Sequence, residues 1–386
     1  MGAPRPMIYF DHNATTPVAP EVLDAMLPFL SASFGNPSSA HAEGGKARKA
    51  VENARRQVAG LLGAASDNEI VFTSCGTESD NWAILGGIQT RPDKDHIVTT
   101  RVEHEAVRKL IEQLEKTGFS VTWLEVDGDG KIEPEQLAEA VSSRTGLVSV
   151  MLANNETGVL FPVKEFAEIV SERSDAVFHV DGVNAAGKVA IDLKDTHIDL
   201  FSVSAHKFHG PKGIGALYIR DGLQLPPYLT GGGQETGRRA GTEAVHQIVG
   251  MGAAAELVSD LAPMKKVQEL RDRLENGILA TVPKTRVNGA RDPSFRLANT
   301  TNISFENTNG EMILSRLDDL GICVSTGSAC NSADHSASPV LSAMNIPYSF
   351  TMGSIRFSLG RFNTDHEVAA VLDYLPGIIN DLRAIG

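Results

Sequence analysis

A lysine flanked by two histidines stands directly after an apolar run in the middle of the chain. The stretch SVSAHKFHGPKG (202–213) places Lys207 beside His206, and the apolar run begins at Ile198. A lysine next to a strand end is most often simply solvated. A lysine amine held in a pocket can instead form a Schiff base with a carbonyl compound. The residues that the fold brings near Lys207 decide between the two interpretations.

Three further polar clusters also follow short apolar runs. Residues 74–79 open a predicted helix, so backbone N–H groups and the Thr77 hydroxyl can hold a phosphate there. Thr77 could equally be a plain N-cap of its own helix. Residues 154–158 follow a second run, and Asp181 follows a third. A carboxylate at the end of so apolar a run needs a partner, which is either a turn that it caps or a cationic ring nitrogen.

The elements that position these clusters alternate between strand and helix. Nearly all-apolar strands in such an alternation are typical of an α/β fold with a mainly parallel sheet covered by helices on both faces. Ligands in these sheets bind at the carboxyl ends of the strands. The predicted strands are 69–73, 96–100, 121–126, 146–152, 176–180 and 199–204, and the predicted helices include 77–91, 105–117, 133–141 and 163–173.

A phosphate cradle, a buried acid and a lysine amine are therefore expected at one edge of one sheet. Pyridoxal 5'-phosphate needs all three, because it binds through a Schiff-base lysine, an acid at its ring nitrogen and an anion site. We interpret Lys207 as the Schiff-base lysine and Asp181 as the acid. The cradle is formed by Gly76 and Thr77, and Ser204 and His206 steady the phosphate.

The bulk composition excludes several classes of function. A formal net charge of -13 over 386 residues argues against a nucleic-acid partner bound through its phosphates. No apolar run approaches membrane-spanning length, and the N-terminal residues do not resemble a signal peptide. Cys75, Cys323 and Cys330 are too far apart for a metal or redox CxxC motif, and their odd number favours a reduced, cytoplasmic location. We expect no metal site.

The pattern predicts two domains. A large cofactor-binding domain is expected over 16–263, where Pro263 ends a long helical region. A smaller α+β domain is expected from 1–15 together with 264–386, and it contains the loop 325–338. This loop is rich in Ser, Ala and Gly, a composition that predicts mobility.

Taken together, the motifs resemble those of the cysteine desulfurases of iron–sulfur cluster and nitrogenase maturation, within the class V aminotransferase family. The resemblance runs nearly end to end and implies the aminotransferase-like fold type I. The motifs are DHNATT (11–16), FGNPSS (34–39), GTES (76–79), Glu103-His104, NNETG (154–158), HVDGV (179–183), SAHKFHGPKG (204–213), GRRAGTE (237–243) and STGSAC (325–330).

The resemblance implies roles for further residues. His104 is similar to the histidine that stacks on the pyridine face; the alternative is a histidine that only starts a helix. Asn155 resembles the residue that contacts the cofactor hydroxyl and the substrate, and Arg356 the arginine that binds the substrate carboxylate. Thr242 resembles the threonine that reaches the phosphate of a neighbouring subunit, which implies a homodimer with shared active sites.

One position departs from the family pattern. The residue three places after the acid is usually Gln, and it reaches the ring oxygen of the cofactor, whereas this chain has Asn184. Asn is one methylene shorter, so the contact is expected to lengthen or to pass through water. This departure is expected to affect how the protein tunes the cofactor, and not the class of reaction.

Cys330 is the cysteine that the resemblance identifies as the nucleophile. An exposed thiol on a mobile loop can move between a buried cofactor and an outside acceptor. Cys323 lies in an apolar strand and is expected to be inert, and Cys75 is interpreted as structural.

The predicted reaction converts L-cysteine to L-alanine and leaves a persulfide on Cys330, from which sulfur passes to an acceptor scaffold protein. A selenocysteine lyase, another lyase or an aminotransferase on the same scaffold is the alternative enzyme. A non-catalytic scaffold of a cluster-assembly complex is the alternative of a different class. Retention of Lys207, Asp181, His104 and Cys330 argues against it.

Overall fold

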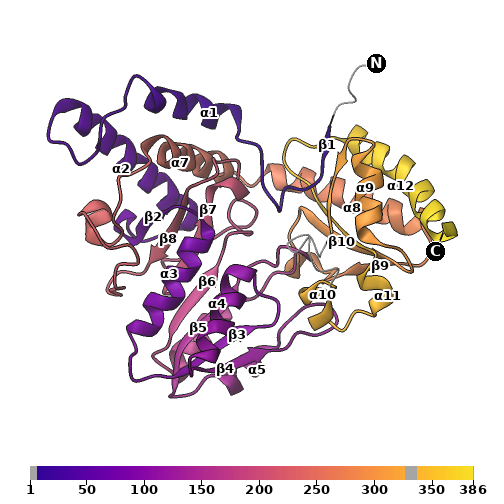
Figure 1. Ribbon diagram of the computed structural model, residues 1–386, viewed down its shortest axis with the longest axis horizontal. Helices are drawn as coiled ribbons and strands as arrows, with labels where there is room; N and C mark the ends of the chain where they lie inside the picture. The colour runs from indigo at the N-terminus through magenta and orange to yellow at the C-terminus, as the bar shows by residue number, and fades with distance from the viewer. Residues whose placement is uncertain (1–6, 327–336, 386) are drawn as a thin grey trace.

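The computed structural model describes residues 7–326 and 337–385 of the chain, which are organised around two separate sheets (Figure 1). The larger sheet has seven strands in the order β2-β8-β7-β6-β5-β3-β4. Its strands are β2 (Ile70–Thr73), β3 (His96–Thr100), β4 (Ser120–Leu124), β5 (Thr145–Met151), β6 (Val177–Asp181), β7 (Leu200–Ser204) and β8 (Gly215–Ile219).

The larger sheet is mainly parallel, as predicted. The strands β3 to β7 pair with one another in parallel, and β8 runs antiparallel to both of its neighbours, β7 and β2. All six strands predicted from the sequence are present, with ends shifted by at most two residues. β8, which follows a glycine-rich turn, was not among them.

Helices cover both faces of this sheet, which confirms the α/β prediction. The side chains of β5 alternate between the faces: Leu147 packs with Trp82 and Ile111 on one face, whereas Val148 and Val150 join the core on the other. The first face is covered by α3 (Gly76–Gln89) and α4 (Glu105–Lys116). The second is covered by α2 (Ala42–Leu62), α5 (Pro134–Ala140), α6 (Val163–Arg173) and α7 (Val245–Ser259), with α1 (Pro20–Met26) and η1 (Leu27–Leu30) beyond α7.

The smaller sheet is antiparallel, in the order β12-β13-β10-β9, and a short parallel pair, β1 with β11, lies beside it. In Figure 1 the first strand of the chain lies together with the last third of the chain. The elements are β1 (Ile8–Tyr9), α8 (Pro263–Thr281), β9 (Thr285–Asn288), β10 (Thr300–Phe305), α9 (Gly310–Asp318), β11 (Ile322–Cys323), β12 (Ser325–Thr326), α10 (Pro339–Ala343), α11 (Tyr348–Thr351), β13 (Ser354–Ser358) and α12 (Asp365–Ile385).

Two apolar cores correspond to the two sheets. Phe10 from the start of the chain packs with Val267, Phe357 and Leu375 in the core of the smaller sheet. Val340 of α10 packs instead into the core of the larger sheet. The division into a large and a small domain at 15/16 and 263/264 stays a prediction. Within the described residues, no helix is both long and apolar enough to cross a membrane.

The carboxyl ends of β3, β5, β6 and β7 meet at one edge of the larger sheet, because these strands run in the same direction. Close packing there requires a glycine after β6. A Cβ on Gly182 would lie 2.0 Å from the Phe201 ring of β7. The turn that leaves β6 can therefore lie tightly against the neighbouring strand, and it leads directly to Asn184.

Candidate active site

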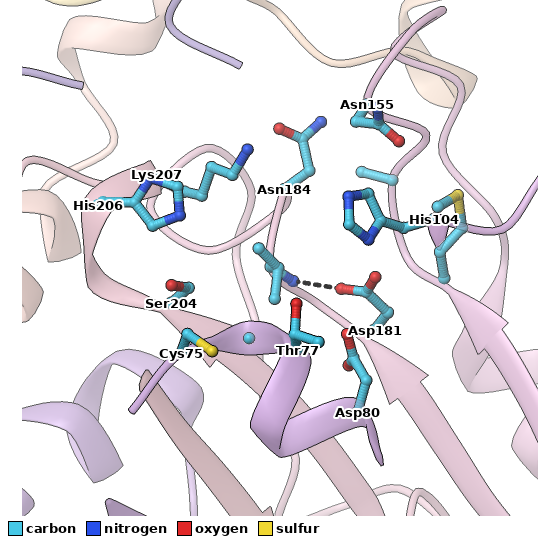
Figure 2. Close-up of a pocket in the computed structure, with 14 residues that line it drawn as sticks. Cys75, Thr77, Asp80, His104, Asn155, Asp181, Asn184, Ser204, His206 and Lys207 are labelled. Carbon is cyan, nitrogen blue, oxygen red and sulfur yellow. Dashed lines mark hydrogen bonds between the residues drawn. The ribbon is translucent and has the colours of Figure 1, made fainter. Parts of the chain in front are cut away.

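A cavity of about 170 Å³ opens at this edge of the larger sheet (Figure 2). Lys207 and His104 point into it from opposite sides, and Asp181 and Thr77 lie below them in the view of Figure 2. Nine residues that the sequence predicted for the site line this one cavity: Gly76, Thr77, His104, Asn155, Asp181, Asn184, Ser204, His206 and Lys207. Their chemical roles stay predictions.

The N-terminus of α3 forms one wall of the cavity. The N-cap is Cys75, which makes no side-chain cap hydrogen bond, so the alternative that Thr77 caps its own helix is wrong. Thr77 is exposed toward the cavity. A Cβ on Gly76 would lie 2.7 Å from Val183, so glycine is needed for this close approach. The free backbone N–H groups of the first helical turn thus border a cavity large enough for an anion.

Asp181 is the last residue of β6 and is buried. Its Oδ1 accepts a hydrogen bond from the Val183 backbone N–H at 2.9 Å, so it does cap a turn. Burial, together with the nearby carboxyl of Asp80, raises its pKa. No ion pair joins it to a basic side chain in the described part of the chain. A cationic group in the cavity would offset this burial and keep the carboxylate ionised.

Lys207 ends the short helix η3 (Ala205–Lys207), which directly follows β7. Its Nζ donates to the backbone oxygens of Asn13 at 2.5 Å and of Ala14 at 3.1 Å. The N-terminal segment therefore lies against the lysine and holds its amine at the edge of the cavity. The Ser204 Oγ is buried and makes no hydrogen bond with the described residues, so it has capacity to bind a ligand.

His104 is the N-cap of α4, where its Nδ1 accepts a hydrogen bond from the Ala106 backbone N–H at 3.2 Å. The alternative of a histidine that starts a helix is therefore correct locally, but the ring also lines the cavity. Desolvation lowers the pKa of His104, and Lys207 adds to this effect. With Nδ1 as an acceptor, a neutral ring carries its proton on Nε2.

Buried titratable groups lie at and near the cavity wall, of which Asp80 lines the cavity, and no role was assigned to them from the sequence. Burial raises the pKa of Asp80 to about 7 and that of Glu103 to about 8. His179 lies between Ser149 and Ser202, at 2.9 Å and 3.0 Å, and burial lowers its pKa to about 4. The available signal was a polar residue in or near an apolar segment: His179 inside β6, Glu103 just after β3 and Asp80 in α3.

Two predicted residues do not line the cavity. Arg356 of β13 donates from Nη1 to the Asn155 carbonyl at 3.1 Å and from Nη2 to Asp11 Oδ1 at 2.7 Å. It reaches the edge of the cavity from the smaller sheet, through Asn155. Thr242 is exposed, on the segment between η4 (Gln234–Gly237) and α7, and is absent from the cavity wall.

The three cysteines differ in what the structure shows. Cys330 lies outside the described residues. Cys75, interpreted from the sequence as structural, lines the cavity beside Gly76. Cys323 is half-buried in β11, and burial raises the pKa of its thiol, which agrees with an unreactive group.

Comparisons with known proteins define the class. The sequence model of the family described as aminotransferase class-V matches residues 8–371, and the chain belongs to this family. It is 52% identical over 380 residues to "Cysteine desulfurase 2" of Trichormus variabilis, covering 98% of this chain and 94% of that protein. It is 47% identical over 380 residues to "Cysteine desulfurase NifS" of Azotobacter vinelandii, with the same coverage of 98% and 94%.

Solved structures agree with this assignment. A "NIFS-LIKE PROTEIN" superimposes with a TM-score of 0.91 at 38% identity, covering 98% of this chain and all (100%) of the other. "SspA in complex with cysteine" superimposes with a TM-score of 0.81 at 36% identity, covering 92% and 100%. The predicted fold and family are thereby confirmed.

Proposed function

We propose that this protein is a pyridoxal-phosphate-dependent cysteine desulfurase, which converts L-cysteine to L-alanine and transfers the sulfur to Cys330 as a persulfide. The observation that carries the proposal is the convergence of Lys207, Asp181 and the first turn of α3 on one cavity. The relatives named cysteine desulfurase support the substrate, because they match over nearly the whole chain.

The residues of the cavity fit pyridoxal phosphate. The N-terminus of α3 and the unpartnered Ser204 hydroxyl offer donors to its phosphate. Asp181 offers a carboxylate to its ring nitrogen, and His104 offers a ring on the side opposite Lys207. Lys207 offers the amine that holds its aldehyde carbon. When bound, this cofactor supplies a sink for the electrons released at the substrate Cα.

The chain's own residues would move the protons. Lys207 is positioned by the Asn13 and Ala14 carbonyls and takes the proton from the substrate Cα. Asp181 would keep the ring nitrogen of the cofactor protonated, since a buried carboxylate is stabilised by an adjacent cation. Arg356 and Asn155 lie together at the cavity edge and bind the substrate carboxylate.

Sulfur transfer is assigned to Cys330. Its thiolate attacks the substrate sulfur, so an S–S bond forms while the substrate Cβ–S bond breaks. The electron pair of the broken bond stays with the carbon skeleton, which is protonated to give L-alanine. The products are a Cys330 persulfide and alanine, and no external oxidant or reductant is needed for this step.

We further propose a homodimer with shared active sites. Thr242 is exposed and lies outside its own chain's cavity, so a phosphate contact by Thr242 requires the cavity of a second subunit. Leu23, Leu27 and Leu30 are 48%, 49% and 56% exposed on α1 and η1, and a partner surface would cover them.

A scaffold protein of iron–sulfur cluster assembly or a related pathway is the proposed sulfur acceptor, in the cytoplasm. A persulfide has to be passed on before the cysteine can react again, which is the reason to expect an acceptor. The two described cysteines, Cys75 and Cys323, are unpaired thiols, a state that a reducing compartment maintains.

The test is to incubate the cofactor-loaded protein with L-cysteine and a thiol reductant and to measure alanine and sulfide together. Equal formation of both is expected, and a Lys207→Ala variant should form neither and lose the visible absorbance of the cofactor. Lys212→Ala is the matched control, because Lys212 is exposed in the same segment. Amino-group transfer to a keto acid would instead identify an aminotransferase, and absence of all products a non-catalytic role.

A further inference from the structure

Lys188 is a buried lysine that has amide oxygens, and not an acid, as its partners. Its Nζ donates to the Asn184 backbone oxygen at 2.9 Å, to Asn184 Oδ1 at 2.8 Å and to Asn13 Oδ1 at 3.2 Å. The residue is 9% exposed, and no ion pair links it to a carboxylate among residues 7–326 and 337–385. A buried lysine normally has an acid as its partner. The amide-oxygen partners of Lys188 therefore need a different explanation.

The charge of Lys188 does not determine the direction of these hydrogen bonds. Burial lowers its pKa well below the usual value, and the nearby cations Lys207 and Arg356 lower it further. The ammonium form has three N–H donors for the three oxygens. The neutral amine has two donors and one lone pair, and in that form the contact of Asn184 Nδ2 with the Asn154 carbonyl, which a reversed amide would lose, keeps Oδ1 toward Lys188. The three partner atoms are all oxygens that accept hydrogen bonds.

This arrangement fixes which end of the Asn184 amide faces Lys188. Its Oδ1 accepts from Lys188, and its Nδ2 lies 3.4 Å from the Asn154 carbonyl oxygen. Reversing the amide would bring two oxygens together at Asn154. The side chain of Asn154 is itself held, because Nδ2 donates to Val102 O at 3.1 Å and Oδ1 accepts from the Thr157 N–H at 2.9 Å.

The Asn184 side chain also lines the cavity, between Lys207 and Asn155 in Figure 2. An amide nitrogen carries two N–H groups, and the Asn154 carbonyl takes one of them. The other is available to a ligand. We propose that Lys188 is a positioning residue that holds the Asn184 amide so that it presents an N–H donor, and not an oxygen, to the cavity.

The inference rests on the proposed function, because it defines how the cavity recognises an oxygen acceptor on the pyridoxal ring. Lys188 also binds Asn13, whose backbone oxygen accepts from Lys207. One buried amine thus ties the donor at Asn184 to the segment that holds the reactive lysine. Asn184, the shorter residue at this position, remains oriented without the extra methylene of Gln.

The experiment compares Lys188→Met, Asn184→Ala and the double variant with the wild-type protein, using pyridoxal phosphate as the ligand. Two quantities are measured in the absence of substrate: the dissociation constant, and the pH midpoint of the visible band of the bound cofactor. Lys194→Met, at an exposed lysine, is the control. Thermal unfolding without cofactor checks that each variant folds.

Each single variant is expected to raise the dissociation constant about 2- to 10-fold, the ratio for one ordinary hydrogen bond, and to shift the midpoint by up to about one pH unit. The double variant should bind the cofactor more tightly than the sum of the two single effects predicts, because the part of the Lys188 effect that passes through Asn184 is already lost in Asn184→Ala. Additive effects, or an unchanged Lys188→Met protein, would overturn the inference. If Lys188→Met does not fold, Lys188→Gln, which keeps N–H donors without the charge, is used instead: it should bind the cofactor like the wild type, and weakened binding in a folded Lys188→Gln protein would overturn the inference.

A wild-type protein that does not bind pyridoxal phosphate would overturn the proposed function, and this inference with it. A wild-type protein that binds the cofactor, with variants that behave additively, would overturn this inference alone. The two failures are therefore distinguishable in one set of titrations.

Discussion

The protein partners of Arg356 determine which of its N–H donors are left for a substrate. Its guanidinium is held by Asp11 at 2.7 Å and by the Asn155 carbonyl at 3.1 Å, while its buried Nε has no partner within residues 7–326 and 337–385. Asp11 offsets the charge of the arginine in the absence of substrate. The remaining N–H donors can bind a carboxylate in a fixed geometry.

We predict that Arg356→Lys raises KM for L-cysteine by about 10- to 100-fold, because lysine cannot reproduce the forked donors of the guanidinium. The matched control is Arg361→Lys. Arg361 donates to backbone oxygens of Leu257 and Asp260 at 3.2 Å and 3.3 Å, away from the cavity. Steady-state kinetics of alanine formation provide the measurement. An Arg356→Lys enzyme with wild-type KM would remove Arg356 from the substrate site.

Cys330 can be tested independently of the described structure. Cys330→Ala should keep the visible absorbance of the cofactor and lose persulfide formation, because the thiolate is the only group assigned to attack the substrate sulfur. Cys323→Ala should behave as wild type, since that thiol is half-buried with a raised pKa. Mass spectrometry of the protein after exposure to L-cysteine detects the added sulfur. A Cys330→Ala protein that still carries a persulfide contradicts the assignment.

At the scale of elements, the ends of β3 and β5 are connected through a buried acid. Glu103 follows β3, and its Oε1 accepts from the Thr100 hydroxyl at 2.8 Å and from the Met151 N–H of β5 at 3.0 Å. Its Oε2 is buried and has no hydrogen-bond partner in the part of the chain that the structure describes. This arrangement suits the neutral acid, and burial accordingly raises its pKa to about 8.

The raised pKa predicts a pH-dependent stability. The unfolded chain releases the Glu103 proton near the usual glutamate pKa, about 4.3, whereas the folded chain keeps it until about pH 8. The folded state thus binds more protons in this window, so stability falls as pH rises through it, by about 1 kcal/mol per pH unit for this group. Glu103→Gln imitates the neutral acid and should remove that part of the slope.

Urea unfolding of the cofactor-free protein between pH 5 and pH 8 measures this effect. Glu103→Ala is the companion variant, because it loses the acceptor for β5 and should be destabilised by about 1–3 kcal/mol at pH 5, and like Glu103→Gln it should lack that part of the pH slope. Parallel pH profiles for wild type and Glu103→Gln would show that Glu103 is ionised in the folded state.

At the scale of the whole molecule, the site is assembled from both ends of the chain. Asn13 donates to the Thr300 hydroxyl of the smaller sheet at 2.9 Å, and its backbone oxygen accepts from Lys207 of the larger sheet. Arg356 of β13 bonds to Asn155, which follows β5. The cavity therefore depends on how the two sheets pack, and the N-terminal segment joins them.

A shared active site predicts complementation between subunits. Lys207→Ala and Thr242→Ala proteins should each be impaired, yet hybrid dimers contain one intact site if Thr242 acts in the neighbouring cavity. Random mixing of equal amounts should restore about a quarter of the wild-type sites, and hybrid dimers purified away from the parent dimers should have about half of them. Coexpression of two differently tagged chains, followed by double purification and an alanine assay, provides the measurement. Hybrids without activity would place Thr242 in its own subunit's site, and a fully active Thr242→Ala protein would place it outside both sites.

The sequence by itself determined the strands of the larger sheet and the polar residues at their ends. The six predicted strands were found because a buried parallel strand is apolar along its whole length. The nine predicted cavity residues converge because parallel strands end at the same edge, a consequence of direction that needs no long-range information.

The tertiary structure alone decided the contacts between distant residues. The hydrogen bonds of Lys188 to Asn13, of Arg356 to Asp11 and of Glu103 to Met151 join residues 175, 345 and 48 positions apart. Local periodicity assigns each residue to an element, but it does not state which buried side chains meet. That depends on the packing of the two sheets, and on the requirement that each buried polar group find a partner within hydrogen-bond reach.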